Sequence, residues 1–80
     1  MKWYRINTDF LSKDYDTIAR EISTPAGDEK ENAIELYEKE LAKNQFCIDD
    51  KTKKARVQLV EYIYSEKLGR TIQTIIAQNY

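Results

Sequence analysis

The chain has 80 residues, and its 13 basic side chains nearly balance 14 acidic ones, leaving a formal net charge of −1. This length predicts a single domain over residues 1–80 with a thin core. The balance excludes the strong positive field typical of many proteins that bind nucleic acids or anionic membranes. Because 11% of the residues are aromatic and 41% are hydrophobic, we expect a folded protein.

Several kinds of site are excluded by the residues that are missing or rare. The sequence has no His, a single Cys (Cys47) and two Gly, so it lacks the usual proton shuttle, a cysteine zinc cage and a glycine-rich phosphate loop. No run approaches the roughly 20 apolar residues of a membrane helix, and no signal-peptide pattern occurs. We therefore expect a cytoplasmic protein that is no enzyme and binds neither a metal, a cofactor nor a membrane.

The N-terminal third is expected to form two strands. Apolar or Thr side chains alternate with polar ones at the start of the chain, which predicts a strand over residues 2–8. Residues 17–24 fit two patterns, because Ile18 and Ile22 suit a strand but also fall at helical spacing. The turn chemistry of Thr24-Pro25-Ala26-Gly27 favours the strand.

A helix is expected over residues 28–43. Asp28 can cap its free N–H groups, and Glu31 stands three residues later, as in a capping box. One side carries an apolar stripe with Leu36 near its border, formed by Ala33, Ile34, Tyr37 and Leu41. The glutamates on the rest of the helix are expected to be a solvated face; the alternative is an acidic patch for a basic partner.

The C-terminal part reads as sheet. Residues 55–64 and 71–77 are rich in β-branched and aromatic types, and Gly69 between them can adopt the positive φ of a hairpin turn. A short additional strand is expected at 45–48. The prediction is an α+β fold in the order ββαββ, an antiparallel sheet with one helix on one face. The alternative is one long helix over residues 55–78, because the apolar residues of this segment also fit the period of a helix.

The predicted C-terminal strands are apolar on both sides, whereas one helix can cover only one face of the sheet. The other face is expected to expose Trp3, Val60, Tyr62, Tyr64 and Ile75. Aromatic, charge-poor surfaces of this kind are typical of interface cores, so we expect this face to bind another protein or a second copy in a homodimer. The alternative is that the N-terminal hairpin folds over the face and closes an ordinary core.

The only basic cluster is Lys51, Lys53, Lys54 and Arg56. It suggests a second function, a small nucleic-acid-binding module in which an aromatic side chain stacks on bases. Against it, Asp49 and Asp50 dilute the field, and lysines also protect strands from unwanted pairing. The composition resembles that of small accessory proteins of phages and plasmids of low-GC bacteria. This resemblance transfers no residue and implies an inhibitor or regulator of a host protein.

Overall fold

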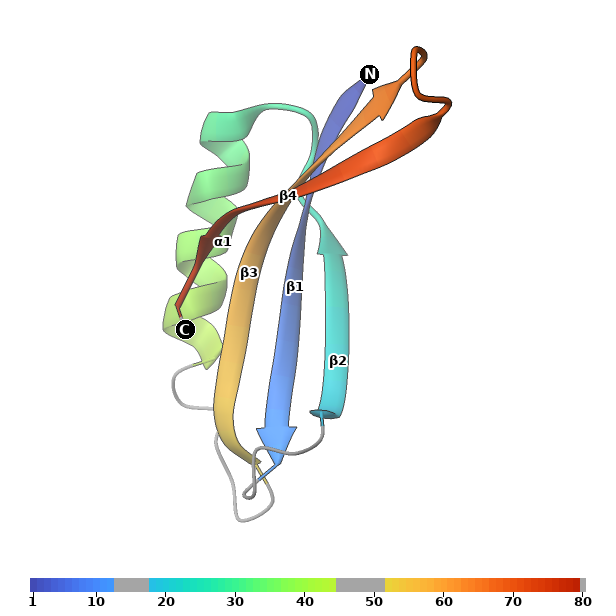
Figure 1. The fold of residues 1–80 in the computed structure, drawn as a ribbon. Helices are drawn as coiled ribbons and strands as arrows, with labels where there is room; N and C mark the ends of the chain where they lie inside the picture. Colours follow the sequence, from blue (N-terminus) through green and yellow to red (C-terminus); the bar gives the residue numbers. More distant parts are fainter. Residues whose placement is uncertain (13–17, 45–51, 80) are drawn as a thin grey trace.

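The computed structural model describes residues 1–12, 18–44 and 52–79. Five elements follow one another: β1 (Lys2–Ser12), β2 (Ile18–Pro25), α1 (Lys30–Asn44), β3 (Thr52–Ser65) and β4 (Arg70–Gln78). All strand pairs are antiparallel and α1 covers one face of the sheet (Figure 1). The α+β class and the ββαββ order are thus confirmed, and residues 17–24 belong largely to a strand. The alternative long helix over 55–78 is wrong; the strand expected at 45–48 lies outside the described residues.

The strand order across the sheet is β2-β1-β3-β4. β1 therefore lies inside the sheet and pairs with β2 on one side and with β3 on the other. This arrangement satisfies the backbone donors and acceptors of β1 on both of its edges. The N-terminal hairpin consequently extends the sheet. The alternative in which it folds over the open face is wrong.

The connection from β2 to α1 stays attached to the sheet beyond Pro25. The Ala26 N–H donates to the Tyr4 carbonyl at 2.9 Å, and the Tyr4 N–H donates to the Gly27 carbonyl at 2.8 Å. Gly27 has a φ of 78°, a conformation that costs glycine little. Only two residues then separate this pairing from the helix.

The helix begins at Lys30, two residues after the predicted start. Its first backbone hydrogen bond runs from the Ala33 N–H to the Glu29 carbonyl at 3.0 Å, so Glu29 occupies the capping position and the Asp28 capping box is wrong. The Asn32 Nδ2 group donates to the Glu29 carboxylate at 3.1 Å. Because pairing with β1 continues to Gly27, Asp28 is used to turn the chain away from the sheet.

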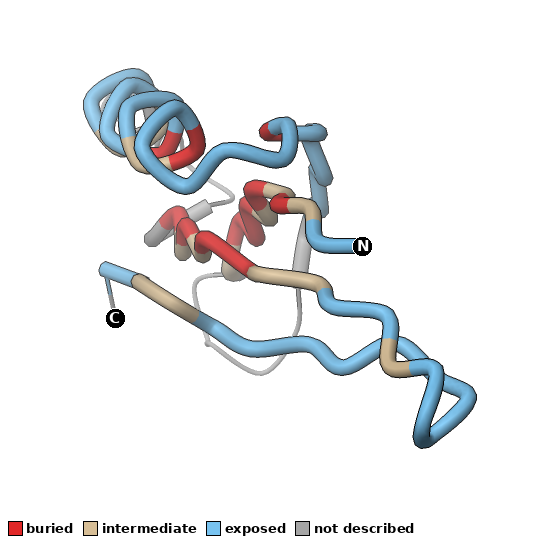
Figure 2. The backbone as a smooth tube through the Cα atoms, turned by 90° about the horizontal axis from the view of Figure 1, so that it is seen from above, coloured by how far each residue is buried: buried red, intermediate tan, exposed pale blue. Residues whose placement is uncertain are grey.

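The hydrophobic core lies between α1 and the two central strands (Figure 2). Ala33 and Tyr37 are buried, and Ile34 and Leu41 pack partly buried beside them, while Leu36 stays 40% exposed. The predicted stripe is therefore confirmed, including its border. Among the side chains that the structure describes, the largest fully buried ones come from the sheet: Tyr4, Ile6, Phe10, Val57 and Leu59.

The helix is much shorter than the strand that it covers. Fifteen residues of α1 span about 22 Å at the rise of an α-helix, whereas the 14 residues of β3 span about 46 Å. The outer end of the β3–β4 hairpin therefore projects beyond α1 and is mostly exposed (Figure 2). We call this part, residues 62–73, the hairpin arm.

A β-bulge in β4 returns the end of the strand to the core. Val60 pairs with Ile75 but Leu59 pairs with Ala77, which leaves Ile76 as the extra residue. Ile76 and Ala77 both pack partly buried against the core. Ala77 therefore lies on the face that α1 covers and not on the face of Ile75, because the bulge shifts the alternation by one residue.

Candidate functional site

The five residues predicted to bind a partner lie on the open face of the sheet, opposite α1. Trp3 pairs with Tyr62 across β1 and β3, and their rings stack with centroids 5.7 Å apart at an interplanar angle of 7°. Tyr64 is two residues further along β3 and points to the same side. Val60 pairs directly with Ile75 of β4. We call this set the aromatic patch: Trp3, Val60, Tyr62, Tyr64 and Ile75.

Exposure increases outward through the aromatic patch. Val60 is only 4% exposed, whereas Tyr64 is 46% and Ile75 is 51% exposed. Trp3 and Tyr62 are half-buried between these limits. Val60 is thus the floor of the patch, and the stacked pair is held in one orientation. Covering what remains of Tyr64 and Ile75 would contribute about 1 kcal/mol each.

The other half of the open face is polar and internally bonded. Arg5 Nε donates to the Ser23 hydroxyl at 2.8 Å, and this hydroxyl donates to Asn7 Oδ1 at 2.7 Å. Beside them, the Gln58 and Gln78 amides are joined at 2.9 Å. An apolar centre next to satisfied polar groups has the composition of an interface with its rim.

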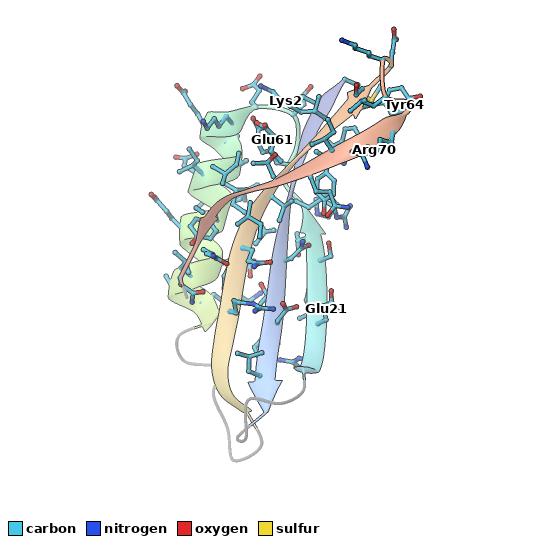
Figure 3. All side chains as sticks on the ribbon, in the orientation of Figure 1. Lys2, Glu21, Glu61, Tyr64 and Arg70 are labelled. Carbon is cyan, nitrogen blue, oxygen red and sulfur yellow. The ribbon has the colours of Figure 1, made fainter. Side chains whose placement is uncertain are left out.

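The hairpin arm is also apolar on the side that faces the same way as α1. Ile63 pairs with Ile72, and each is 39% exposed. Leu68, in the turn of the arm, is 56% exposed. Sequence reasoning missed Ile63 and Ile72 because it expected the helix to cover their face of the sheet, and it placed Leu68 only in the turn between the two strands. Because a strand rises about twice as far per residue as a helix, the lengths of the predicted helix and strand already indicated that the strand extends beyond the helix. Figure 3 shows Tyr64 and Arg70 at this projecting end, away from α1.

Tyr4 joins the core to the base of the hairpin arm. Its hydroxyl donates to Glu61 Oε2 at 2.8 Å, while its ring is 1% exposed. Burial raises the pKa of the Tyr4 hydroxyl above its ordinary value of 10, and the hydrogen bond to the Glu61 carboxylate raises it further. Burial likewise raises the pKa of Tyr37. Both hydroxyls are therefore protonated at neutral pH, and that of Tyr4 donates to Glu61.

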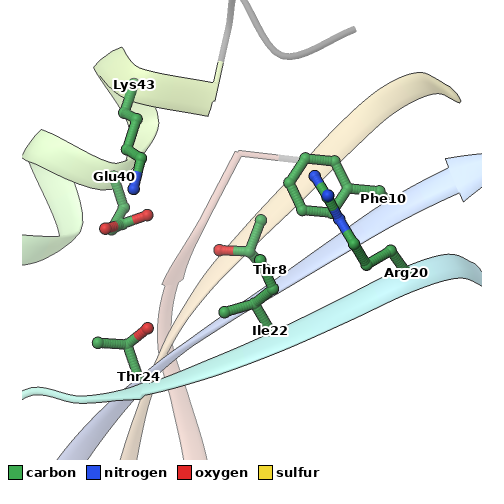
Figure 4. A pocket seen from close by; sticks show the side chains of 7 residues that line it. All are labelled: Thr8, Phe10, Arg20, Ile22, Thr24, Glu40 and Lys43. Atoms are coloured by element: carbon green, nitrogen blue, oxygen red, sulfur yellow. The ribbon is translucent and has the colours of Figure 1, made fainter. Parts of the chain in front are cut away.

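A hollow lies between α1 and β2, where the helix leaves the edge of the sheet uncovered (Figure 4). The hollow has a volume of about 220 Å³. The Arg20 guanidinium lies 4.2 Å above the centre of the Phe10 ring on its floor. Basic and acidic side chains both border the hollow, so its lining does not indicate one class of ligand. The lining residues are Thr8, Phe10, Arg20, Ile22, Thr24, Glu40 and Lys43.

The basic cluster of the nucleic-acid hypothesis is described only in part. Arg56 pairs with Asp9 across β3 and β1, and its Nη2 atom lies 2.7 Å from Asp9 Oδ2. The Asp9 side chain is 8% exposed, so Arg56 neutralises a buried carboxylate. Lys53 and Lys54 belong to β3, and Lys51 falls outside the described residues. No observation of this structure favours nucleic-acid binding at the cluster.

Among the described residues, no three acidic or Cys side chains are grouped so that they could share a metal ion. The described helix is too short and too polar to cross a lipid bilayer. Comparisons of the chain with protein-family models, with curated proteins and with solved structures found no significant match.

Proposed function

We propose that this protein is a small non-enzymatic binding module that attaches to another protein through the aromatic patch. One observation carries the proposal: five apolar side chains meet on a face that neither α1 nor the N-terminal hairpin covers. Removing such a surface from water is favourable in proportion to its apolar area. The proposed module acts in the cytoplasm, the setting favoured by its single Cys. Its proposed role as an inhibitor or regulator follows from the composition that it shares with small accessory proteins of phages and plasmids.

The geometry of the aromatic patch suits recognition because part of the ordering cost is met before binding. The stack with Trp3 and the pairing of β1 with β3 restrict the Tyr62 side chain in the free protein. Rigid aromatic side chains lose little conformational entropy when they are buried at an interface. Tyr64 and Ile75 then supply the exposed apolar area that a partner covers.

The test uses Trp3, the only tryptophan of the chain, as a fluorescent reporter inside the patch. A partner is first captured from the source cell by photo-crosslinking and identified by mass spectrometry. Its affinity is then measured by titration of Trp3 emission for the wild type, Ile75→Glu and Gln58→Glu. The control places the same new charge on the same face, but in the polar half.

We expect Ile75→Glu to weaken binding at least tenfold, because a charge is then desolvated against an apolar surface. Gln58→Glu should bind like the wild type, and circular dichroism should show the same fold for all three proteins. Equal losses for both variants, or a partner that binds without changing Trp3 emission, would contradict the proposal.

A further inference from the structure

β4 is an edge strand that lacks the usual protection against pairing. No other strand among the described residues pairs with its outer edge. The part of β4 after Arg70, Thr71–Gln78, contains no charged residue, no Pro and no Gly. Residues 70–75 of the strand are all exposed. A long, exposed, uncharged edge rich in β-branched residues is a template for a further strand.

The opposite edge of the sheet is protected. β2 carries Arg20 and Glu21 side by side and ends at Pro25, and all three residues are exposed. Charges and proline on an edge strand oppose the addition of another strand. The two edges of one sheet therefore differ in chemistry, and β4 is the edge that is suited to pairing.

We propose that β4 pairs antiparallel with β4 of a second copy across a two-fold axis, so that the two sheets become one continuous eight-stranded sheet. This goes beyond the proposed function, since the pairing uses the main-chain edge of β4; Ile75 is the one residue that this edge shares with the aromatic patch. Main-chain hydrogen bonds between the two strands supply the attraction, as in other strand additions. Ile72 and Ile75 of each copy gain apolar neighbours along the new pair.

The occupant is a second copy because β4 is its own complement. In antiparallel pairing about the centre of the strand, Arg70 of one copy lies near Gln78 of the other, and no like charges oppose each other. A two-fold axis perpendicular to the sheet places both α1 helices on one side and both aromatic patches on the other. The pair therefore presents two patches on one surface.

The experiment measures solution mass by light scattering over a wide range of concentrations for the wild type, Thr74→Lys and Thr24→Lys. Both threonines are exposed on edge strands and share the face that α1 covers, so the two variants are matched in type and charge. Thr74→Lys places a cation opposite Glu61 of β3, which favours the hairpin of the free chain. It also places two lysines close together in the proposed pair.

We expect the wild type and Thr24→Lys to reach twice the chain mass of 9.5 kDa, and Thr74→Lys to remain at the mass of one chain with an unchanged circular dichroism spectrum. Hydrogen exchange adds a measurement on the wild type alone: the exposed residues of β4 should become protected as the concentration rises. These results would support the proposal even if Thr74→Lys failed to fold.

Three outcomes would overturn it. The first is a wild type that stays at the mass of one chain at every concentration. The second is a dimer whose β4 amides gain no protection. The third is a dimer that dissociates in Tyr62→Glu but persists in a folded Thr74→Lys variant. This result would place the contact between the two copies on the aromatic patch. The two proposals can fail independently, because Thr74→Lys changes the edge without changing the aromatic patch, and Trp3 emission reports on the patch alone.

Discussion

Tyr4 holds three parts of the molecule together at one position. Its backbone bonds to the segment that follows β2, its ring lies in the core beneath α1, and its hydroxyl bonds to Glu61 at the base of the hairpin arm. A phenol in this position must remain protonated to donate. The burial that makes Tyr4 useful to the fold thus also makes the fold sensitive to alkaline pH.

The raised pKa of Tyr4 sets the direction of that sensitivity. The folded state holds the proton more tightly than the unfolded chain, so the stabilisation is complete below pH 10, the ordinary tyrosine pKa, and is lost as the pH rises above it. Tyr4→Phe should lower the urea midpoint at pH 8 because the bond to Glu61 is lost. It should also lose less stability than the wild type between pH 9 and pH 11.

Urea unfolding followed by circular dichroism at several pH values checks this. Tyr37→Phe, which removes the other hydroxyl whose pKa is raised by burial, should also reduce the alkaline loss. Combining the two substitutions should reduce it most. A Tyr4→Phe variant that keeps the whole alkaline slope of the wild type would show that the Tyr4 proton plays no part.

The Asp9–Arg56 pair is a second local determinant of stability. Arg56→Met should destabilise the protein by about 1–3 kcal/mol, because it leaves the buried Asp9 carboxylate without its partner. Adding Asp9→Asn should recover part of this loss, since the uncompensated charge is removed. A double-mutant cycle by urea denaturation measures the coupling, and additive effects of the two substitutions would contradict it.

At the scale of elements, the turn of the hairpin arm depends on Gly69. Its φ is 64°, yet a Cβ at this position would meet no atom within 4 Å. The cost of Gly69→Ala is therefore backbone strain without a clash, about 1–2 kcal/mol. Gly69→Asn should cost less, because Asn tolerates positive φ. Thermal unfolding of both variants tests this ranking, and equal melting temperatures would argue against it.

Elements were predictable where periodicity is strong. The helical stripe of Ala33, Tyr37 and Leu41 and the β-branched runs of the C-terminal strands were enough to assign α1, β3 and β4. The ends of elements were less predictable: β1 continues to Ser12, and α1 starts two residues late. Hydrogen bonds with neighbouring strands set these ends, and such bonds join residues that are distant in the sequence.

For the whole molecule, the open face and its five apolar residues could be inferred from alternation, because alternation decides which side chains share a face. The strand order could not, since a hairpin that folds over a face and one that extends the sheet have the same local pattern. The stack of Trp3 on Tyr62 depends on that order, because β1 must lie beside β3. The bulge at Ile76 was likewise invisible in the pattern of apolar residues.

The protected edge at β2 also limits how far the proposed association can proceed. Joining two copies through β4 consumes the one receptive edge of each, and the outer boundaries of the product are both β2. Arg20, Glu21 and Pro25 then terminate it at each end. Contacts of this isologous kind close on themselves and do not propagate. In the proposed dimer, a strand of amyloid-like composition is therefore paired without the open-ended growth that leads to filaments.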